Sequence, residues 1–255
     1  MENTSEEEII IEVKKKKEFV GLPDKIVREV LAHQTKKYPQ IIQPTSSEKK
    51  VLVKEIRALL RRSTGMFQKG SEKKRQVDAD PHELLKTHRS TAERINDYPL
   101  LKEKIPSLQV KSILDIGCGL NPLALASPAY LYYACDIRQD EIELIQSHFK
   151  KKSIPGKAFV YDLRTYASDL PAADLCLIWK VLDIIPGDKY TLTRKLLASL
   201  QCACIIISFS TRTLSGKPMQ HKRRFWFESI LKELSLSYET WETSNELFYV
   251  IHKKN

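Results

Sequence analysis

The chain has 255 residues, of which 42% are hydrophobic, and it carries a formal net charge of +10 at pH 7. No apolar run approaches the roughly 20 residues that a membrane-spanning helix needs. The acidic N-terminus lacks the basic flank and apolar segment of a secretory signal peptide. We therefore expect a globular protein of the cytoplasm, without membrane contact, that has room for one large domain and a smaller companion.

The cysteines and histidines form no pattern typical of a disulfide framework or a zinc site. The cysteines are odd in number and include no Cys-x-x-Cys pair. Most of them lie in apolar segments, which favours free, buried thiols in a reducing compartment. The histidines do not cluster with cysteines, so no bound metal is expected. The five cysteines are Cys118, Cys135, Cys176, Cys202 and Cys204.

The positive charge is concentrated in one part of the chain. Between Lys36 and Arg94 there are 15 lysines and arginines against 7 acidic residues, a net charge of +8. Such an excess can simply be a solvated surface. It can also bind a polyanion, because each neutralised phosphate releases condensed counterions. We favour a nucleic acid as the partner of this region.

The first hundred residues are expected to form helices. A helix after Ser5 has glutamates in its first turn and lysines at its end, as the helix dipole favours. A second helix opens at Pro23-Asp24 and ends at Tyr38-Pro39. Two short helices are expected at Pro81–Lys86 and Ser90–Asp97.

The third long helix, which starts at Ser46 or Ser47, separates apolar from basic residues. Its inward-facing candidates are Val51, Ile56, Leu59 and Leu60, and its opposite face carries Lys54, Arg57, Arg61 and Arg62. We assign residues 1–105 to a helical, basic domain that docks on RNA.

From about Pro106 short apolar runs alternate with amphipathic stretches, a pattern typical of a parallel sheet with helices on both faces. Two strands at the C-terminus are separated only by a turn and should form an antiparallel hairpin at the sheet edge. Class I methyltransferases have this feature, so residues 106–255 are expected to form a Rossmann-like α/β methyltransferase domain with seven strands. The expected strands are Ser112–Ile116, Tyr130–Cys135, Ala158–Tyr161, Asp174–Trp179, Cys202–Phe209, Ser237–Trp241 and Leu247–His252, with helices near Asp140–Lys150, Lys189–Leu200 and Arg223–Leu234.

The strongest local motif is the segment Ile113–Pro122, in which an apolar strand ends in an acid and turns through Gly117-x-Gly119. The glycines allow a sharp bend and a close approach of a ligand. A dinucleotide-binding enzyme would need a third glycine where Pro122 stands. The motif therefore favours S-adenosylmethionine over a dinucleotide.

Two acids follow the next two strands. Asp136 lies seventeen residues after Gly119, where a carboxylate can accept hydrogen bonds from ribose hydroxyls. Its alternative role is the N-cap of the helix that begins at Gln139. Asp162, with Leu163 beside it, can contact the adenine amine, or it can be a turn residue.

Motifs of other methyltransferases are missing, which narrows the chemistry. The segment Ile178–Leu182 is not the Asn/Asp-Pro-Pro-Tyr pattern of exocyclic amine methylation, and no cysteine lies in a nucleophile context. What remains is methyl transfer to an atom that is already nucleophilic, such as a purine ring nitrogen. That reaction needs positioning and no general base, so we expect no catalytic residue in the proton-transfer sense.

Several separated segments resemble signatures of the aminoglycoside-resistance 16S rRNA methyltransferases. Leu84–Arg94 resembles the family's Leu-x-x-His-x-Ser-Thr-x-Glu-Arg motif, and Gly119–Leu125 its Gly-x-Asn-Pro-Leu-Ala-Leu extension. The resemblance runs from about Leu22 to the C-terminus, and the further matching segments are Ser208–Lys217, Trp226–Glu228 and Asn245–Leu247.

This resemblance implies methylation of N7 of guanosine 1405 of 16S rRNA in the 30S ribosomal subunit by a monomeric enzyme. The family docks on the assembled subunit with its N-terminal domain. The flipped guanine becomes positively charged, and this charge would repel a cationic aminoglycoside. The alternatives are methylation of another rRNA position or a small molecule, and a non-catalytic RNA-binding homologue that senses the cofactor.

The resemblance also implies which residues bind S-adenosylmethionine. Arg94 would pair with the methionine carboxylate, and Phe67 would cover the cofactor. The alternatives are a capping or salt-bridge role for His88 and Arg94 and a core role for Phe67. The full set is Phe67, His88, Arg89, Ser90, Arg94, Gly117, Gly119, Asp136, Asp162, Leu163 and Trp179.

The segments expected near the target base depart from the family pattern. A glutamine expected after the fourth strand is missing at residues 186–188, Ser210 replaces a proline, and the run at 216–221 differs. These departures concern the target nucleotide more than the cofactor. The expected RNA contacts are Arg57, Arg61, Arg62, Arg212, Lys217 and Arg224.

Overall fold

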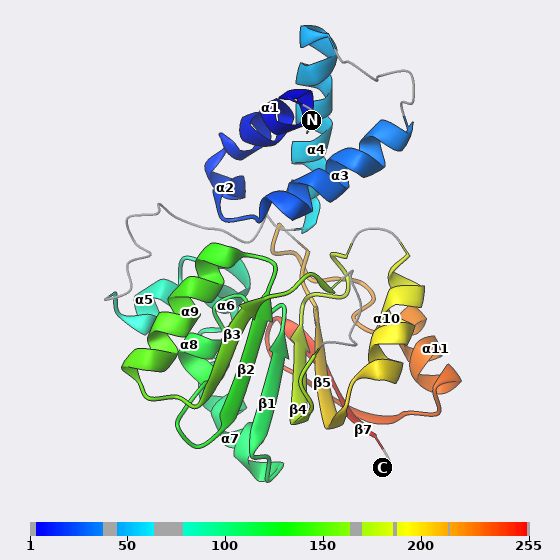
Figure 1. Ribbon diagram of the computed structural model, residues 1–255. Coiled ribbons are helices and arrows are strands. Elements are labelled where there is room, and N and C mark those ends of the chain that lie inside the picture. The colour runs from blue at the N-terminus through cyan, green and yellow to red at the C-terminus, as the bar shows by residue number, and fades with distance from the viewer. Residues whose placement is uncertain are drawn as a thin grey trace.

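A computed structural model of the chain describes residues 4–37, 45–63, 79–163, 170–185, 188–213 and 215–253 (Figure 1). The first four helices form a bundle with its own core, built around Val13, Phe19, Val27 and Ile56. Their bounds are α1 (Thr4–Lys14), α2 (Lys17–Val20), α3 (Asp24–Lys37) and α4 (Ser46–Ser63). The three long helices confirm the sequence-based expectation, whereas the short α2 was not expected.

One residue of α4 was placed on the wrong face. Val51 was expected to point inward but is 56% exposed, while Leu52, Ile56 and Leu60 are buried. Residues four apart share a face of a helix, and Val51 lies about 140° around the axis from Ile56. The apolar stripe of α4 therefore runs through Leu52 rather than Val51.

The next three helices are α5 (Pro81–Leu85), α6 (Arg89–Arg94) and α7 (Tyr98–Ser107). Helix α7 was not predicted, because Pro99 and Pro106 interrupt its sequence; Pro99 lies in the first turn, where a helix tolerates proline, and Pro106 lies one residue before the helix ends. Its buried residues Leu101 and Ile105 join the core under the sheet and not the core of α1–α4. The expected division of the chain after residue 105 does not coincide with this packing.

A seven-stranded sheet with the order β3-β2-β1-β4-β5-β7-β6 follows. Strands β1 to β5 are parallel, and β7 pairs antiparallel with both β5 and β6. The expected C-terminal hairpin at the sheet edge is confirmed. The strands are β1 (Ser112–Ile116), β2 (Leu131–Asp136), β3 (Gly156–Val160), β4 (Ala173–Trp179), β5 (Cys202–Ser210), β6 (Ser237–Glu242) and β7 (Glu246–His252).

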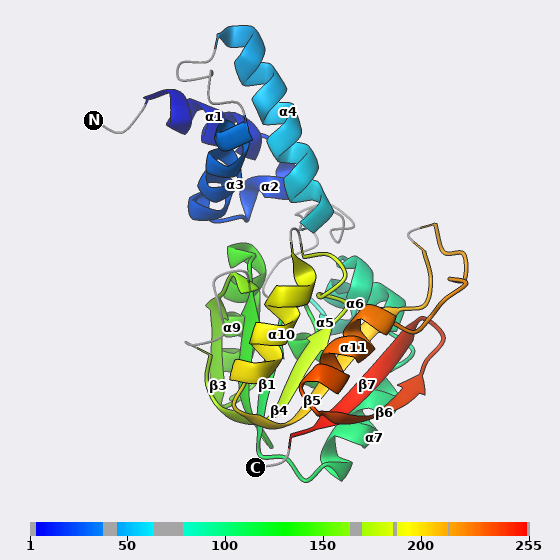
Figure 2. The same ribbon diagram turned by 90° about the vertical axis from the view of Figure 1, so that its right-hand side faces the viewer.

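Helices cover both faces of the sheet (Figures 1 and 2). On one face α5, α7, α8 (Pro122–Leu125) and α9 (Gln139–Lys151) enclose one apolar core, and on the other α10 (Lys189–Ser199) and α11 (Phe225–Glu233) enclose a second. Neighbouring strand residues alternate between the two cores, as the pleat requires. All five cysteines are buried and free.

The register brings the carboxyl ends of the central strands to one edge. Ile116 of β1 pairs with Cys135 of β2, and Asp115 pairs with Leu177 of β4. The bundle α1–α4 stands over this edge (Figure 1). None of the described helices combines the length and apolar character needed to cross a lipid bilayer.

Candidate functional site: a cofactor cavity at the strand ends

The loop after β1 is shaped by its two glycines. Gly117 and Gly119 have φ angles of 62° and 48°, in the left-handed region that favours glycine. A Cβ atom on Gly117 would lie 2.5 Å from Cγ2 of Val181, and one on Gly119 would lie 3.0 Å from Cε1 of His88. Both positions therefore need glycine for backbone conformation and for space, as the sequence motif predicts.

Asp136 lies at the end of β2 and faces this loop. Its carboxylate accepts hydrogen bonds from the backbone N–H of Gly119 at 2.9 Å and of Arg138 at 3.1 Å. Burial and the nearby carboxylate of Glu141 raise the pKa of Asp136. The alternative role of a helix N-cap does not fit, because the N-cap of α9 is Arg138 and no side chain caps it.

His88 and Ser90 approach the loop from the start of α6. Oγ of Ser90 lies 3.0 Å from Nδ1 of His88. Nε2 of His88 lies 3.9 Å from the buried carboxylate of Glu141. The imidazole thus stands between the glycine loop and the start of α9, which links the family-like segment Leu84–Arg94 to the strand ends.

These residues meet in a cavity that holds about 900 Å³ of empty space, its open mouth included. We call it the central cavity. It brings together seven of the predicted cofactor contacts: His88, Ser90, Gly117, Asp136, Asp162, Leu163 and Trp179.

Sequence reasoning missed more than half of the lining. Ile137 directly follows Asp136 and could have been found from its position. Ile26 and Leu60 belong to the apolar stripes of α3 and α4, which look like ordinary core in the sequence. The full set of missed residues is Ile26, Leu60, Ile116, Ile137, Arg138, Glu141, Tyr161, Lys180, Val181, Ile184 and Ile185.

Arg94 does not line the cavity but lies behind it. Its guanidinium is 1% exposed, donates to both carboxylate oxygens of Glu246 at 2.9 Å, and donates to Oδ1 of Asn121 at 2.6 Å. Burial lowers the pKa of Arg94, but the charges and hydrogen bonds of Glu246 and Tyr98 together outweigh it, so the net pKa is raised. Its salt-bridge alternative is therefore observed, and binding of the methionine carboxylate stays a prediction.

Trp179 and Lys180 close the cavity at the end of β4. The guanidinium of Arg94 lies 4.9 Å from the ring centroid of Trp179, within the range of a cation–π contact. Lys180 has a φ of 60° and donates to Glu93 at 2.5 Å. A non-glycine residue in the left-handed region is uncommon and often marks a functional site. Lys180 was not among the predicted residues.

Of the three remaining predicted contacts, two do not line the cavity and one falls outside the described residues. Nε of Arg89 donates to Glu93 at 2.9 Å, and Arg89 does not line the cavity. Phe67 lies outside the described residues. Gly119 shapes the loop from the side of His88 without lining the cavity itself.

The expected RNA contacts differ in how free their side chains are. Arg57 donates to the carbonyl oxygens of Glu12 and Val13 near the end of α1, and Arg61 pairs with Glu18. The side chain of Arg62 lies outside the described residues.

The remaining three expected RNA contacts, Arg212, Lys217 and Arg224, lie between β5 and α11. The chain that follows β5 extends away from the sheet in Figure 2. Arg212 and Lys217 are exposed. Arg224 is 9% exposed, pairs with Asp183 at 2.9 Å and donates to the carbonyl of Ser210. Arg224 therefore holds this segment against the fold, and the structure does not present its guanidinium to RNA.

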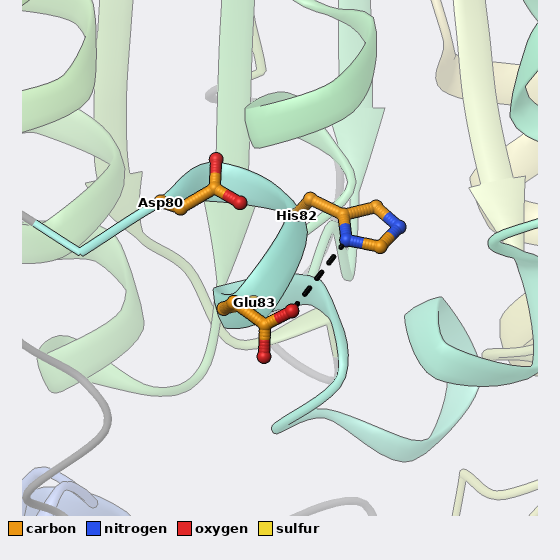
Figure 3. A group of neighbouring side chains, drawn as sticks. All are labelled: Asp80, His82 and Glu83. Atoms are coloured by element: carbon orange, nitrogen blue, oxygen red, sulfur yellow. Dashed lines mark ion pairs between the residues drawn. The ribbon is translucent and has the colours of Figure 1, made fainter.

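A group of potential metal ligands lies at the start of α5, away from the central cavity. The ligand atoms of Asp80, His82 and Glu83 lie within 4.8 Å of one another (Figure 3). All three side chains are exposed, and the carboxylate of Glu83 already pairs with the ammonium of Lys86 at 2.5 Å. Because that ammonium competes with a cation, we assign no metal to this group.

The central cavity fits an amino-acid-bearing nucleoside. Gly117 lines the cavity and has no side chain, so a ligand can approach its backbone closely. Nε1 of Trp179 is buried and has no hydrogen-bond partner among the described residues, so a donor is available at the cavity wall. The carboxylate of Asp136 supplies an acceptor on the opposite strand, and apolar residues such as Ile137 and Leu163 supply flat walls.

Comparisons with known proteins agree with this geometry. The profile of the family described as "Ribosomal RNA methyltransferase (FmrO)" matches residues 48–250. A 16S rRNA (guanine(1405)-N(7))-methyltransferase of Serratia marcescens is 32% identical over 178 residues, which cover 68% of this chain and 70% of the relative. An enzyme with the same name from Micromonospora echinospora is 28% identical over 206 residues, covering 77% and 73%.

Solved structures show the same fold. The 16S rRNA methylase RmtB has a TM-score of 0.74 and 25% identity, with 99% of this chain and 100% of that chain covered. The 16S rRNA methyltransferase RmtF, crystallised with S-adenosyl-L-homocysteine, has a TM-score of 0.82 and 22% identity with both chains fully covered. On the profile match and the relatives together, this chain belongs to the FmrO family of ribosomal RNA methyltransferases.

Proposed function

We propose that the protein transfers a methyl group from S-adenosylmethionine to N7 of guanosine 1405 of 16S rRNA in the 30S subunit, and thereby confers aminoglycoside resistance. The observation that carries the proposal is the central cavity, in which seven predicted cofactor contacts from five separate segments converge. The names of the relatives support the choice of nucleotide and atom. We further propose that it acts as a monomer in the cytoplasm.

When bound, S-adenosylmethionine supplies an electrophilic methyl group on a sulfonium. In this proposal Asp136 accepts hydrogen bonds from the ribose hydroxyls, and Asp162 and Leu163 contact the adenine; all three line the cavity. Gly117 lets the backbone approach the ligand. Arg94 lies behind the cavity wall, where its guanidinium contacts Trp179 and its charge is balanced by the carboxylate of Glu246.

The chain's contribution to the methyl transfer is positioning. N7 of guanine carries a free lone pair, so no proton has to be removed and no general base is needed. The proposal therefore expects no essential proton-transfer group among the residues that line the cavity. The methylated ring is cationic and repels a cationic aminoglycoside.

RNA docking is supported by a groove between α1 and α4, which we call the basic groove. It is lined by seven cationic side chains and by Glu8 and Glu12. Lys50 and Lys54 are exposed and lie one helical turn apart on α4. Cations gathered in a concave surface suit a phosphate backbone. The cations are Lys15, Lys16, Lys49, Lys50, Lys54, Arg57 and Arg61.

The test is to incubate 30S subunits from a susceptible bacterium with the protein and tritiated S-adenosylmethionine, and to map the label by mass spectrometry of nuclease fragments. Label on guanosine 1405, at N7, is the expected result. Label on another nucleotide would keep the enzyme class but overturn the assigned site. Unlabelled RNA after prolonged incubation would support a non-catalytic RNA-binding protein. Free 16S rRNA in a parallel reaction tests whether the assembled subunit is needed.

A further inference from the structure

The N-terminal bundle contributes directly to the central cavity. Ile26 of α3 and Leu60 of α4 line it, together with residues that follow β1, β2 and β4. Both side chains are also part of the bundle's own core, at 4% and 1% exposure. The position of the bundle relative to the sheet therefore sets the shape of one cavity wall.

Arg138 holds the bundle in this position. Its guanidinium is buried and donates to the carbonyl oxygen of Glu18 in α2 at 2.9 Å and to Asp140 at 2.8 Å. Its backbone N–H donates to Asp136, so the same residue contacts the bundle and the acceptor at the end of β2.

A second hydrogen bond runs beside the first. The backbone N–H of Gln139 donates to the carbonyl of Gly21 at 3.0 Å. A Cβ atom on Gly21 would lie 2.1 Å from Oδ1 of Asp140 and 2.6 Å from Nη2 of Arg138, so a larger residue would displace these two side chains. We call Glu18, Gly21, Arg138, Gln139 and Asp140 the clasp.

We propose that the N-terminal bundle is part of the cofactor site, and that Arg138 is a positioning residue that fixes the bundle as a cavity wall through the clasp. This inference rests on the proposed function, because it takes the cavity to hold S-adenosylmethionine or its demethylated product. Opening the clasp moves Ile26 and Leu60 and widens the cavity. Thermodynamic linkage also requires that cofactor binding affects the clasp. A cofactor that contacts both the N-terminal bundle and the strand ends of the sheet stabilises the clasp.

The same geometry couples the cofactor to RNA. The basic groove lies on α1 and α4, and Leu60 of the cavity wall belongs to α4. If one rigid helix contacts RNA on one surface and the cofactor on another, a movement of that helix at either surface also moves the other. Cofactor affinity is therefore expected to depend on the bundle even when no RNA is bound.

Isothermal titration calorimetry with S-adenosylhomocysteine on the full chain tests the inference. Arg138→Gln removes the bond to α2, and Gly21→Ala pushes the clasp apart from the bundle side without altering a cavity-lining residue. Each is expected to raise Kd about tenfold, a usual size for coupled sites. Arg194→Gln is the matched control, because Arg194 pairs with Glu233 on the surface of α10 and α11, away from the cavity. Thermal unfolding shows whether each variant is folded.

The outcomes separate this inference from the proposed function. If the unmodified protein binds no S-adenosylhomocysteine, the proposed function fails. If it binds and both clasp variants bind equally well, the inference fails while the function stands. If only Arg138→Gln weakens binding, Arg138 acts by touching the ligand and not by positioning the bundle, which also overturns the inference.

Hydrogen exchange on the unmodified protein needs no variant to fold. S-adenosylhomocysteine is expected to slow amide exchange in peptides covering residues 17–31 and 54–62, in addition to those that follow β1 and β2. Protection confined to the residues after position 80 would contradict the inference.

Discussion

The carboxylate of Asp136 has two structural tasks and one proposed functional task. It accepts the backbone N–H groups of Gly119 and Arg138, and so ties the glycine loop to the start of α9. We expect Asp136→Ala to weaken S-adenosylhomocysteine binding by about 10- to 100-fold, since hydrogen bonds to a charged group contribute about 1.5–3 kcal/mol. Calorimetry measures this loss.

Asp174 provides the matched control for that variant. Its carboxylate also accepts backbone N–H groups, from Lys111 and Ser112, but at the start of β1, at the opposite end of the strands. Asp174→Ala is expected to lower thermal stability and to leave the Kd for S-adenosylhomocysteine unchanged. An equal loss of affinity in both variants would show that Asp136 acts through general stability.

A second acid, Asp115, governs stability rather than binding. It is fully buried in β1, accepts a hydrogen bond from Tyr132 at 2.9 Å, and its Oδ1 has no partner among the described residues. Burial raises the pKa of Asp115 to about 7, well above the usual range of an aspartate. The folded protein therefore holds a proton that the unfolded chain has lost between about pH 4 and pH 7.

This difference predicts the sign of a pH effect. Because the folded state binds more protons in that window, the contribution of Asp115 to stability decreases as pH rises from about 4 to 7. Asp115→Asn removes the titration, so the variant is expected to lose less stability than the unmodified protein between pH 5 and pH 8. Urea unfolding at several pH values measures the difference, which is of order 1–4 kcal/mol. Parallel curves for the two proteins would refute the assignment.

At the scale of elements, the loop after β1 can be tested against a second glycine turn. Gly117 and Gly216 both have positive φ, at 62° and 84°. A Cβ on Gly117 meets Val181 at 2.5 Å, whereas one on Gly216 has nothing within 4 Å. Alanine at either position strains the backbone by roughly 1 kcal/mol or more.

Only the substitution at Gly117 also adds a methyl group at the cavity wall, where it would displace Val181. We therefore expect both alanine variants to unfold at a lower temperature, and only Gly117→Ala to lose affinity for S-adenosylhomocysteine. Scanning calorimetry and titration calorimetry on the same samples give the two readouts. Reduced affinity in Gly216→Ala would mean that strain alone, transmitted from a distant turn, disturbs the site.

The elements also show what the sequence could and could not reveal. Most strands of the sheet were predictable because they are short apolar runs, β6 because only a turn separates it from β7, and Gly117 and Asp136 because they follow strand ends. Helix α7 was missed because its two prolines, Pro99 and Pro106, are usually signals that end a helix. Ile26 and Leu60 were predictable as core residues but not as cavity residues, because their position at the cavity depends on how the N-terminal bundle packs against the sheet.

Arg94 marks the same limit for charged side chains. The family-like segment indicated a functional arginine, and the structure pairs it with Glu246, 152 residues later in the chain. No local pattern carries information about a partner at that separation. For the same reason, the sequence placed Arg224 at an RNA surface although its guanidinium is engaged with Asp183.

At the scale of the whole molecule, the net charge of +10 predicts how RNA binding responds to salt. Each phosphate contact releases condensed counterions, so the logarithm of affinity falls with the logarithm of salt concentration. If the basic groove contacts the phosphate backbone, replacing Lys50 and Lys54 by glutamine removes up to two such contacts. The slope should then become shallower by about 1 to 2.

The control for this pair must carry the same charge change elsewhere. Lys150 and Lys151 are exposed at the end of α9, whereas the cavity and the bundle lie toward the start of that helix. Filter binding of 30S subunits over a series of potassium chloride concentrations compares the two double variants. If both change the slope equally, long-range net charge and not the groove determines docking. A change confined to Lys50 and Lys54 instead places phosphate contacts on α4, the helix that also supplies Leu60 to the cavity wall.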